Sequence, residues 1–148
     1  MHDLPGKLSP DQLAELFEGR TRFVERLAEE DSPFGAARRV IATLSDEEKK
    51  EALDSHPAIG ERREPLSPLS SREQGGDADP QVLAELDKLN RMYEQRFGFR
   101  FVVFVNRRPK RDILPVLRRR LGRTREEELA TALEELVLIA EDRWLRRS

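Results

Sequence analysis

The sequence predicts an all-α fold, and three observations support this class. Helix-start signals recur along the chain, as Ser-Pro, Asp-Pro or capping-box pairs. Apolar residues repeat at spacings of three and four between those signals. The one stretch with strand propensity, Phe101 to Val105, has no partner strand elsewhere in the sequence. We therefore expect a single compact multi-helix domain over residues 1–148, in which this stretch is a buried extended segment.

Four helices are expected in the first part of the chain. Ser9 and Ser32 each precede a proline, which is typical of an N-cap followed by the first helical residue. Ser45 and Glu48 form a capping box. These signals and the apolar patterns between them predict helices over about residues 10–17, 23–28, 33–44 and 46–54.

Three longer helices are expected in the second part, over about residues 80–97, 111–121 and 125–144. Asp79 opens the first and Gly98 ends it, whereas Gly122 ends the second. Pro115 is expected in or near the first turn of the second helix, where proline is tolerated. The last helix is expected to bury a stripe that consists of Leu129, Leu133, Leu136, Ala140 and Trp144.

A long central loop separates these two groups of helices. Residues 55–78 are rich in proline, glycine and serine and show no periodicity. A loop of this length in a compact domain is usually functional or disordered. The loop is therefore the first place to look for a site.

Composition excludes several classes of protein. Cysteine is absent, which excludes disulfides, thiolate nucleophiles and cysteine-ligated metals. No apolar run approaches the roughly 20 residues that a membrane span needs. The chain begins without the pattern of a signal peptide. A cytoplasmic protein without membrane contact is the simplest interpretation.

Charge is concentrated in residues 96–125, which carry eleven basic side chains and one acidic, a net charge of +10. The whole chain has a net charge of −2. A solvated helix face, a small anionic ligand and a nucleic acid could each account for the basic block. Nucleic acid is the least favoured, because the chain as a whole is acidic and contains no nucleic-acid motif.

Two groups of residues in the central loop could carry chemistry. His56 suits proton transfer, since the unperturbed pKa of histidine lies nearest neutrality. A lone histidine after a helix is more often a C-cap or a surface residue, and with no second histidine or cysteine nearby it predicts no metal site. Ser70, Glu73 and Gln74 gather a hydroxyl, a carboxylate and an amide, although a capped helix start would look the same.

A third group follows the apolar run, where Asn106, Arg107 and Arg108 precede a proline. Guanidinium groups beside a buried backbone could hold a carboxylate through paired hydrogen bonds. A solvated basic turn is the simpler alternative.

The order and spacing of these groups resemble one family. The first motif is His-Pro-x-Ile-Gly-x-Arg, and the second is Ser-x-x-Glu-Gln. The third is Leu-Asn-x-x-Tyr-x-x-x-Phe-Gly-Phe-x-Phe, which is followed by an apolar run and an arginine. Over about residues 10–145 this pattern is similar to the 2-oxo-4-hydroxy-4-carboxy-5-ureidoimidazoline (OHCU) decarboxylases. The resemblance implies an all-α enzyme that forms (S)-allantoin in urate degradation, with the long loop at its active site.

The resemblance also implies a mechanism without metal or organic cofactor. The substrate carries its carboxylate one carbon from a C=N bond, so the ring nitrogen can accept the electron pair when carbon dioxide leaves. The enzyme would orient the carboxylate, stabilise the resulting anion and move a proton. The family commonly forms dimers, which makes a homodimer the expectation.

Several residues of this chain match the family's site. His56 corresponds to the catalytic histidine, a proton donor or acceptor at the hydroxyl-bearing carbon, and Pro57 to the proline that fixes its backbone. Glu73 corresponds to the catalytic glutamate, which would hold ureido and ring N–H groups. Ser70 and Gln74 match neighbouring binding positions.

The remaining matches lie on and after the apolar run. Backbone groups near Val103 and Val105 would contact the substrate ring. The family's arginine falls on Asn106 or on Arg108 here, and we choose Arg108 as catalytic, with Arg107 in reserve and Asn106 as a binding position.

Two departures leave other functions open. Arg100 stands where the family commonly has a proline or an apolar residue, and the run from Gly75 to Ala78 differs from the usual one. A divergent paralogue that binds a ureido or purine-like anion without turning it over is one alternative. A charged helical interaction module is another.

Overall fold

The chain is all-α, as the sequence predicted. The computed structural model describes residues 4–57 and 79–147, and within these ranges the chain forms seven helices and no strand. The helices are α1 (Pro10–Phe17), α2 (Arg22–Leu27), α3 (Pro33–Thr43), α4 (Asp46–Asp54), α6 (Pro80–Phe97), α7 (Lys110–Leu121) and α8 (Arg125–Arg146). Each lies where the sequence predicts a helix, and the ends agree to within two residues.

The predicted start signals form real caps at most of these helices. The Ser45 hydroxyl accepts a hydrogen bond from the Glu48 backbone N–H, while the Glu48 side chain accepts one from the Ser45 N–H. The same reciprocal pair forms at Thr124 and Glu127, at the start of α8. Ser32 is the exception, because it precedes α3 without a side-chain hydrogen bond. There the proline at the first helical position marks the start instead.

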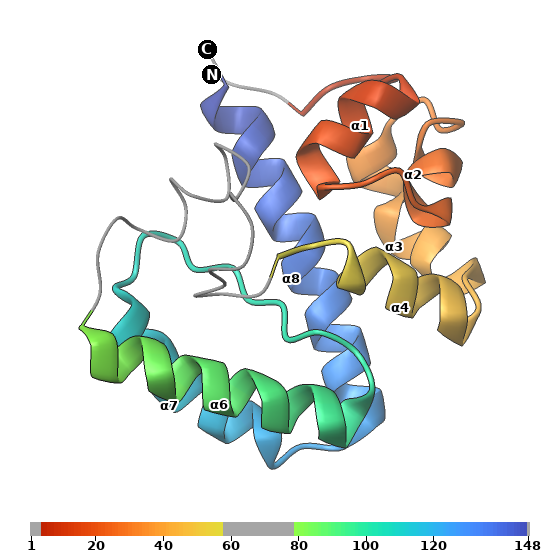
Figure 1. Cartoon of the computed structure of the whole chain (residues 1–148). Coiled ribbons are helices and arrows are strands. Elements are labelled where there is room, and N and C mark those ends of the chain that lie inside the picture. Colours follow the sequence, from red (N-terminus) through yellow and green to blue (C-terminus); the bar gives the residue numbers. More distant parts are fainter. Residues whose placement is uncertain (1–3, 58–78, 148) are drawn as a thin grey trace.

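Helix α8 forms the central axis of the molecule. α1, α3 and α4 pack against it on one side, and α2 packs on α1, α3 and α4. α6 and α7 pack against each other and form a separate layer (Figure 1). This arrangement puts the end of α4 close to the chain that connects α6 to α7.

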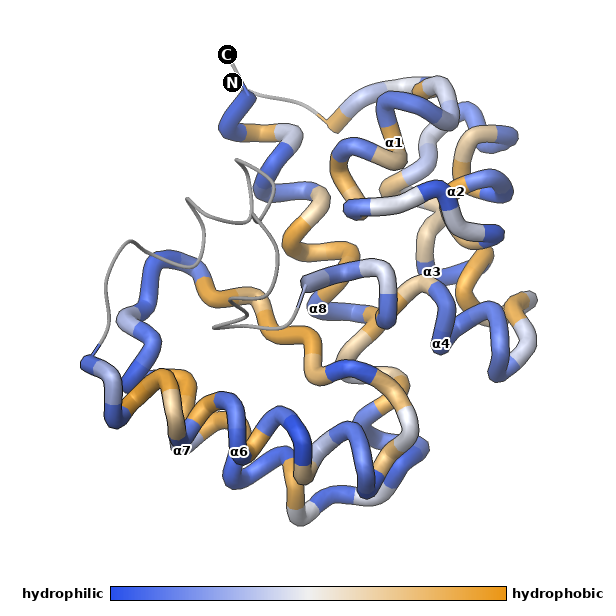
Figure 2. The backbone as a smooth tube through the Cα atoms, viewed as in Figure 1, coloured by the Kyte–Doolittle hydropathy of each residue, from blue (hydrophilic) through white to orange (hydrophobic). Residues whose placement is uncertain are grey.

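That connection is the extended segment, defined here as residues 99–105. Phe101, Val102, Val103 and Val105 are buried, although none is in a helix or strand. Figure 2 shows the apolar character of this segment where it passes back across the molecule from α6 to α7. The expectation of a buried extended stretch without a sheet partner is confirmed within the described residues.

Aromatic rings hold the start of the segment. Tyr93 lies on α6, and its ring centroid is 5.1 Å from that of Phe101, 5.9 Å from that of Phe99 and 4.6 Å from that of Phe97. The ring pairs are tilted or edge-on, the arrangements that aromatic quadrupoles favour. The apolar face of α6 therefore fixes where the segment leaves the helix.

Two details of the predicted helices are wrong. Pro115 lies inside α7, beyond its first turn, where it removes one backbone hydrogen-bond donor. On α8 the buried stripe continues to Arg143 rather than to Trp144, which is only partly buried. The apolar character of Trp144 favours it for a core position, but the helix directs the side chain of Arg143 into the core instead. None of the described helices has the length and apolar character needed to cross a bilayer.

Candidate active site

His56 lies directly after α4 and is buried. Ser55 is the C-cap of that helix, and the His56 backbone N–H donates to the Leu53 carbonyl oxygen over 3.2 Å. The His56 residue is only 8% exposed. The interpretations of His56 as a C-cap or a surface residue are therefore wrong.

Burial dominates the acid–base behaviour of His56. Loss of hydration, followed by the positive charges of Arg143 and Arg100, lowers its pKa from 6.5 to about 3. The imidazole is therefore neutral at physiological pH. Its Nδ1 atom is buried and has no hydrogen-bond partner among the described residues. A neutral buried imidazole with an uncommitted nitrogen can accept a proton from a substrate.

Arg143 was not predicted as a site residue. It is 3% exposed, and its Nη1 lies 2.8 Å from the Leu16 carbonyl oxygen and 3.3 Å from a Glu18 carboxylate oxygen. Its charge acts on His56, so a buried cation stands near the imidazole. The available signal was its position, since Arg143 follows Ala140 by three residues on the buried stripe of α8.

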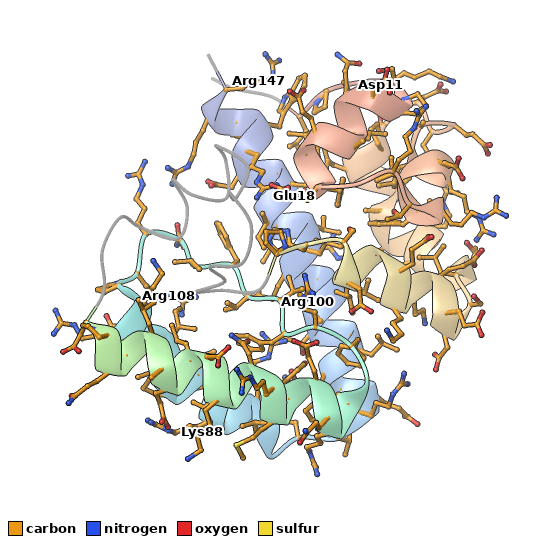
Figure 3. The ribbon with its side chains drawn as sticks, in the orientation of Figure 1. Asp11, Glu18, Lys88, Arg100, Arg108 and Arg147 are labelled. Carbon is orange, nitrogen blue, oxygen red and sulfur yellow. The ribbon has the colours of Figure 1, made fainter. Side chains whose placement is uncertain are left out.

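Arg100 connects His56 to the extended segment. Its backbone N–H donates to Asp54 Oδ1 over 3.0 Å, and its Nη1 donates to the His56 carbonyl oxygen over 2.8 Å. Arg100 and Arg108 lie at opposite ends of the connection between α6 and α7 (Figure 3). The end of α4 is thereby tied to the start of the extended segment.

Along one edge of the extended segment, the backbone of alternate residues is hydrogen-bonded to side chains of α7 and α8. The Val102 carbonyl oxygen accepts from Arg120 Nη1 over 2.8 Å, and the Phe104 N–H donates to Glu135 Oε1 over 2.9 Å. In extended backbone the N–H and C=O groups of successive residues point to opposite edges. The backbone groups of Val103 therefore face the other edge, and no described residue is hydrogen-bonded to them.

A buried ionic network supports this hydrogen-bonded edge. Glu128 of α8, which is fully buried, accepts from Arg120 Nε over 2.7 Å and from the Tyr93 hydroxyl over 2.6 Å. The Arg120 guanidinium also lies 4.6 Å from the centroid of the Phe101 ring. Burial, followed by the hydrogen bond to Glu128, raises the pKa of Tyr93, so its hydroxyl stays protonated and donates.

The basic block therefore has several uses. Arg120 is buried, and Arg125 donates to both the Phe97 carbonyl and Asp46, so a solvated face does not explain the whole block. Arg107, Arg111 and Arg119 are exposed, in agreement with that interpretation for part of it. The sequence alone does not distinguish the buried from the exposed arginines, because it does not show which of them meets a buried partner.

The turn after the segment holds the three candidates for the family's arginine. Asn106 and Arg107 have φ values of 51° and 66°, in the left-handed region that is uncommon outside glycine. Arg108 turns back so that its Nε donates to the Val105 carbonyl oxygen over 2.9 Å and its Nη2 donates to that of Phe104. All three side chains are exposed.

The structure thus brings together His56, Arg100 and Arg143, and Arg100 joins this group to the start of the extended segment. Pro57 follows His56 and is partly buried. Three predicted site residues, Ser70, Glu73 and Gln74, lie outside the described residues, as does the run from Gly75 to Ala78.

Comparison with known proteins gives one consistent family. The profile described as OHCU decarboxylase matches residues 8–145. A protein of Haloferax volcanii named 2-oxo-4-hydroxy-4-carboxy-5-ureidoimidazoline decarboxylase is 29% identical over 147 residues, which cover 93% of this chain and 87% of that protein. The uric acid degradation bifunctional protein PucL of Bacillus subtilis is 32% identical over 148 residues, covering 88% of this chain and 28% of that longer protein.

Solved structures show the same fold. An OHCU decarboxylase crystallised in the presence of (S)-allantoin matches with a TM-score of 0.73 at 22% identity, covering 90% of this chain and 94% of that one. An (S)-allantoin synthase matches with a TM-score of 0.68 at 23% identity, covering 92% of this chain and 48% of the other.

Proposed function

Since this chain belongs to the OHCU decarboxylase family, we propose that it decarboxylates 2-oxo-4-hydroxy-4-carboxy-5-ureidoimidazoline to (S)-allantoin in urate degradation. The chain is accordingly a carboxy-lyase. The observation that carries the proposal is the neutral, buried imidazole of His56 beside the guanidinium groups of Arg100 and Arg143. A neutral imidazole whose Nδ1 has no partner among the described residues suits a reaction in which a proton must be moved.

The reaction balances without an external electron acceptor. The bond between the hydroxyl-bearing carbon and the carboxylate breaks, and carbon dioxide leaves. The electron pair forms a C=C bond to the neighbouring ureido-bearing carbon, while the electrons of the C=N bond move onto nitrogen, which takes a proton. The hydroxyl then loses its proton and becomes the carbonyl of allantoin as the ureido-bearing carbon gains a hydrogen. Only protons must be supplied and removed, which a single imidazole can do.

His56 is the proposed proton carrier. In the free protein the imidazole has a depressed pKa, because it is buried near two positive charges. A bound carboxylate would offset those charges and move the pKa of His56 back towards neutrality. The imidazole could then take the hydroxyl proton and return a proton to one face of the ring, which gives a single enantiomer.

The other proposed contacts follow the family pattern. Glu73 would hold the ureido and ring N–H groups, with Ser70 and Gln74 beside it and Pro57 fixing the backbone of His56. These loop contacts remain predictions.

On the extended segment, backbone groups of Val103 and Val105 would bind the ring. The edge that Val103 presents away from Arg120 and Glu135 supports this role. Arg108, or failing it Arg107, would bind the carboxylate, with Asn106 adjacent.

We further propose that the enzyme works without cofactor, as a cytoplasmic homodimer. The electron sink within the substrate is the reason to expect no cofactor. The dimer rests on the family resemblance alone, and light scattering coupled to size-exclusion chromatography tests it: a mass of one chain would contradict it.

Turnover of freshly prepared substrate by the full chain tests the proposed function. The substrate decays spontaneously, so both the rate and the optical activity of the allantoin must be followed. We expect His56→Ala to lower the rate by roughly 100-fold or more, the usual scale for a lost acid–base group. His56→Asn should not restore activity, since an amide does not titrate near neutral pH. His2→Ala, which removes the other histidine, is the control and should retain activity.

Glu73→Gln extends this test to the loop. The substitution keeps the shape of the side chain but removes its charge, so we expect weaker N–H recognition and a lower rate. Full activity in His56→Ala would overturn the catalytic role of His56, and racemic allantoin at the spontaneous rate from the unmodified chain would overturn the proposed function.

A further inference from the structure

Arg100 lies between the two parts of the candidate site. Its backbone belongs to the extended segment, whereas its side chain reaches His56, at the start of the central loop. The guanidinium Nη1 is 2.8 Å from the His56 carbonyl oxygen, and the Arg100 N–H is 3.0 Å from Asp54 Oδ1. One residue thus makes two hydrogen bonds to the segment 54–56, one from backbone and one from side chain.

We propose that Arg100 is a positioning residue, which fixes the His56 imidazole relative to the extended segment by binding the His56 carbonyl group. The inference rests on the proposed function of His56 as proton carrier. It also gives a role to the arginine at a position where the resembling sequences commonly carry a proline or an apolar residue.

The physical need for such a contact follows from the end of α4. His56 is one residue beyond the C-cap Ser55, so its carbonyl group has no place in the helical hydrogen-bond pattern. Without an external donor, the backbone at His56 could rotate and carry the imidazole with it. A guanidinium donor is well suited, because a charge-assisted hydrogen bond is stronger than a neutral one.

The electrostatic consequence agrees with this geometry. The charge of Arg100 acts on the imidazole as well as on the carbonyl group, and it adds to the lowering of the His56 pKa that burial and Arg143 cause. Arg100 therefore adds to what burial and Arg143 do to keep the imidazole neutral, while it holds the backbone. Both effects act on His56 and neither needs contact with the substrate.

The test uses the full chain with Arg100→Met and Arg100→Lys. Arg100→Met keeps an unbranched apolar stem but removes the donor and the charge. We expect kcat to fall by roughly 10- to 100-fold with little change in KM, since a displaced catalytic group loses rate rather than substrate affinity. Arg100→Lys keeps one donor and the charge, so it should recover part of the lost kcat.

Arg96→Met is the matched control. Arg96 also donates to a backbone carbonyl, that of Arg123, over 3.1 Å, and its guanidinium lies 5.0 Å from the Phe97 ring centroid. The control removes the same kind of contact and the same charge from the same basic block, away from His56. It should leave kcat unchanged even if it lowers the thermal midpoint.

A second readout follows His56 directly. The chain has two histidines, so long-range ¹H–¹⁵N spectra contain the signals of two imidazole rings, and His56→Asn assigns them. We expect the His56 ring signals to shift in Arg100→Met but not in Arg96→Met. A merely structural role would lower the thermal midpoint and leave both the His56 signals and kcat as in the control.

The outcomes separate this proposal from the function on which it rests. Unchanged kcat and unchanged His56 signals in Arg100→Met would overturn it, and so would a raised KM with normal kcat, because that result would place Arg100 on the substrate. If the unmodified chain does not turn over the substrate, the proposed function fails. The imidazole spectra then still decide whether Arg100 sets the position of His56.

Discussion

Arg120 and Glu128 form an ion pair that is buried on both sides: Nε and Oε1 are 2.7 Å apart, and the two side chains are 5% and 0% exposed. Arg120 also binds the Val102 carbonyl group, so the pair connects α7 and α8 to the extended segment. Removing one partner of such a pair leaves a buried charge without compensation.

We therefore predict that Glu128→Leu lowers the free energy of unfolding by about 3 to 5 kcal/mol. Arg120→Met should cost less, because Arg123 Nη1, 2.8 Å from Glu128 Oε2, and the Tyr93 hydroxyl still compensate the carboxylate. The double variant should cost less than the sum of the two single losses, because the two side chains contact each other and their losses are not independent. Urea unfolding of the three variants measures these differences.

The exposed pair Arg38–Glu134 supplies the control, with side chains 63% and 39% exposed. Glu134→Leu should cost much less than Glu128→Leu, because solvent screens the charges of an exposed pair. Equal losses from Glu128→Leu and Glu134→Leu would show that the buried pair does not support the segment.

The helices could be predicted because their signals are local. Ser45 and Glu48 are three residues apart, and the apolar spacing of α6 from Leu86 to Phe97 lies within one element. The extended segment was also predictable, since Phe101 to Val105 is apolar and lacks a partner strand. The caps, the apolar spacing and the apolar run each depend on residues that are close in sequence, so the sequence alone reveals them.

The polar interior could not be predicted in the same way. Arg120, Glu128 and Arg143 are charged residues on buried helix faces. Each has a hydrogen-bond partner on another element, distant in sequence: Val102, Tyr93 and Leu16 respectively. A sequence shows the periodicity that turns these residues inward, but it does not show the partner that makes burial tolerable. The role of Arg100 depends likewise on Asp54 and His56, more than 40 residues away along the chain.

The choice of arginine in the turn after the segment gives a second prediction. We expect Arg108→Ala to raise KM for the anionic substrate by roughly 10-fold or more, the scale of one charged hydrogen bond. Asn106→Ala should have a smaller effect, because an amide offers no charge. Steady-state kinetics on both variants, with Arg107→Ala beside them, measures the difference. Equal losses at both positions, or a loss at Asn106 alone, would show that the arginine is assigned to the wrong position.

The absence of a cofactor requirement is a third prediction. The C=N bond of the substrate accepts the electron pair, so no step of the proposed mechanism needs a metal ion that a chelator could remove. We expect exhaustive dialysis against EDTA to leave kcat unchanged. Activity that disappears on chelation and returns with an added metal ion would contradict the proposed mechanism.

The buried His56 gives a fourth prediction, on stability against pH. In the folded protein burial, then Arg143 and Arg100, lower the pKa of this histidine to about 3, whereas in the unfolded chain it titrates near its ordinary value of 6.5. Between these two values the unfolded chain binds one proton more than the folded protein. The free energy of unfolding therefore falls as the pH drops through that window, by up to about 1.4 kcal/mol per pH unit from this residue, and this loss is absent above about pH 7.

His56→Asn removes the titrating group and with it this part of the pH dependence. Between pH 7.5 and pH 5.0 we expect the unmodified chain to lose about 2 kcal/mol more of its free energy of unfolding than His56→Asn loses. Urea unfolding at the two pH values measures the difference, and His2→Asn is the control that should behave like the unmodified chain. If His56→Asn and the unmodified chain lost stability equally over this range, His56 would titrate alike in the folded and unfolded states. It could not then be the buried, neutral imidazole on which the proposed proton transfer depends.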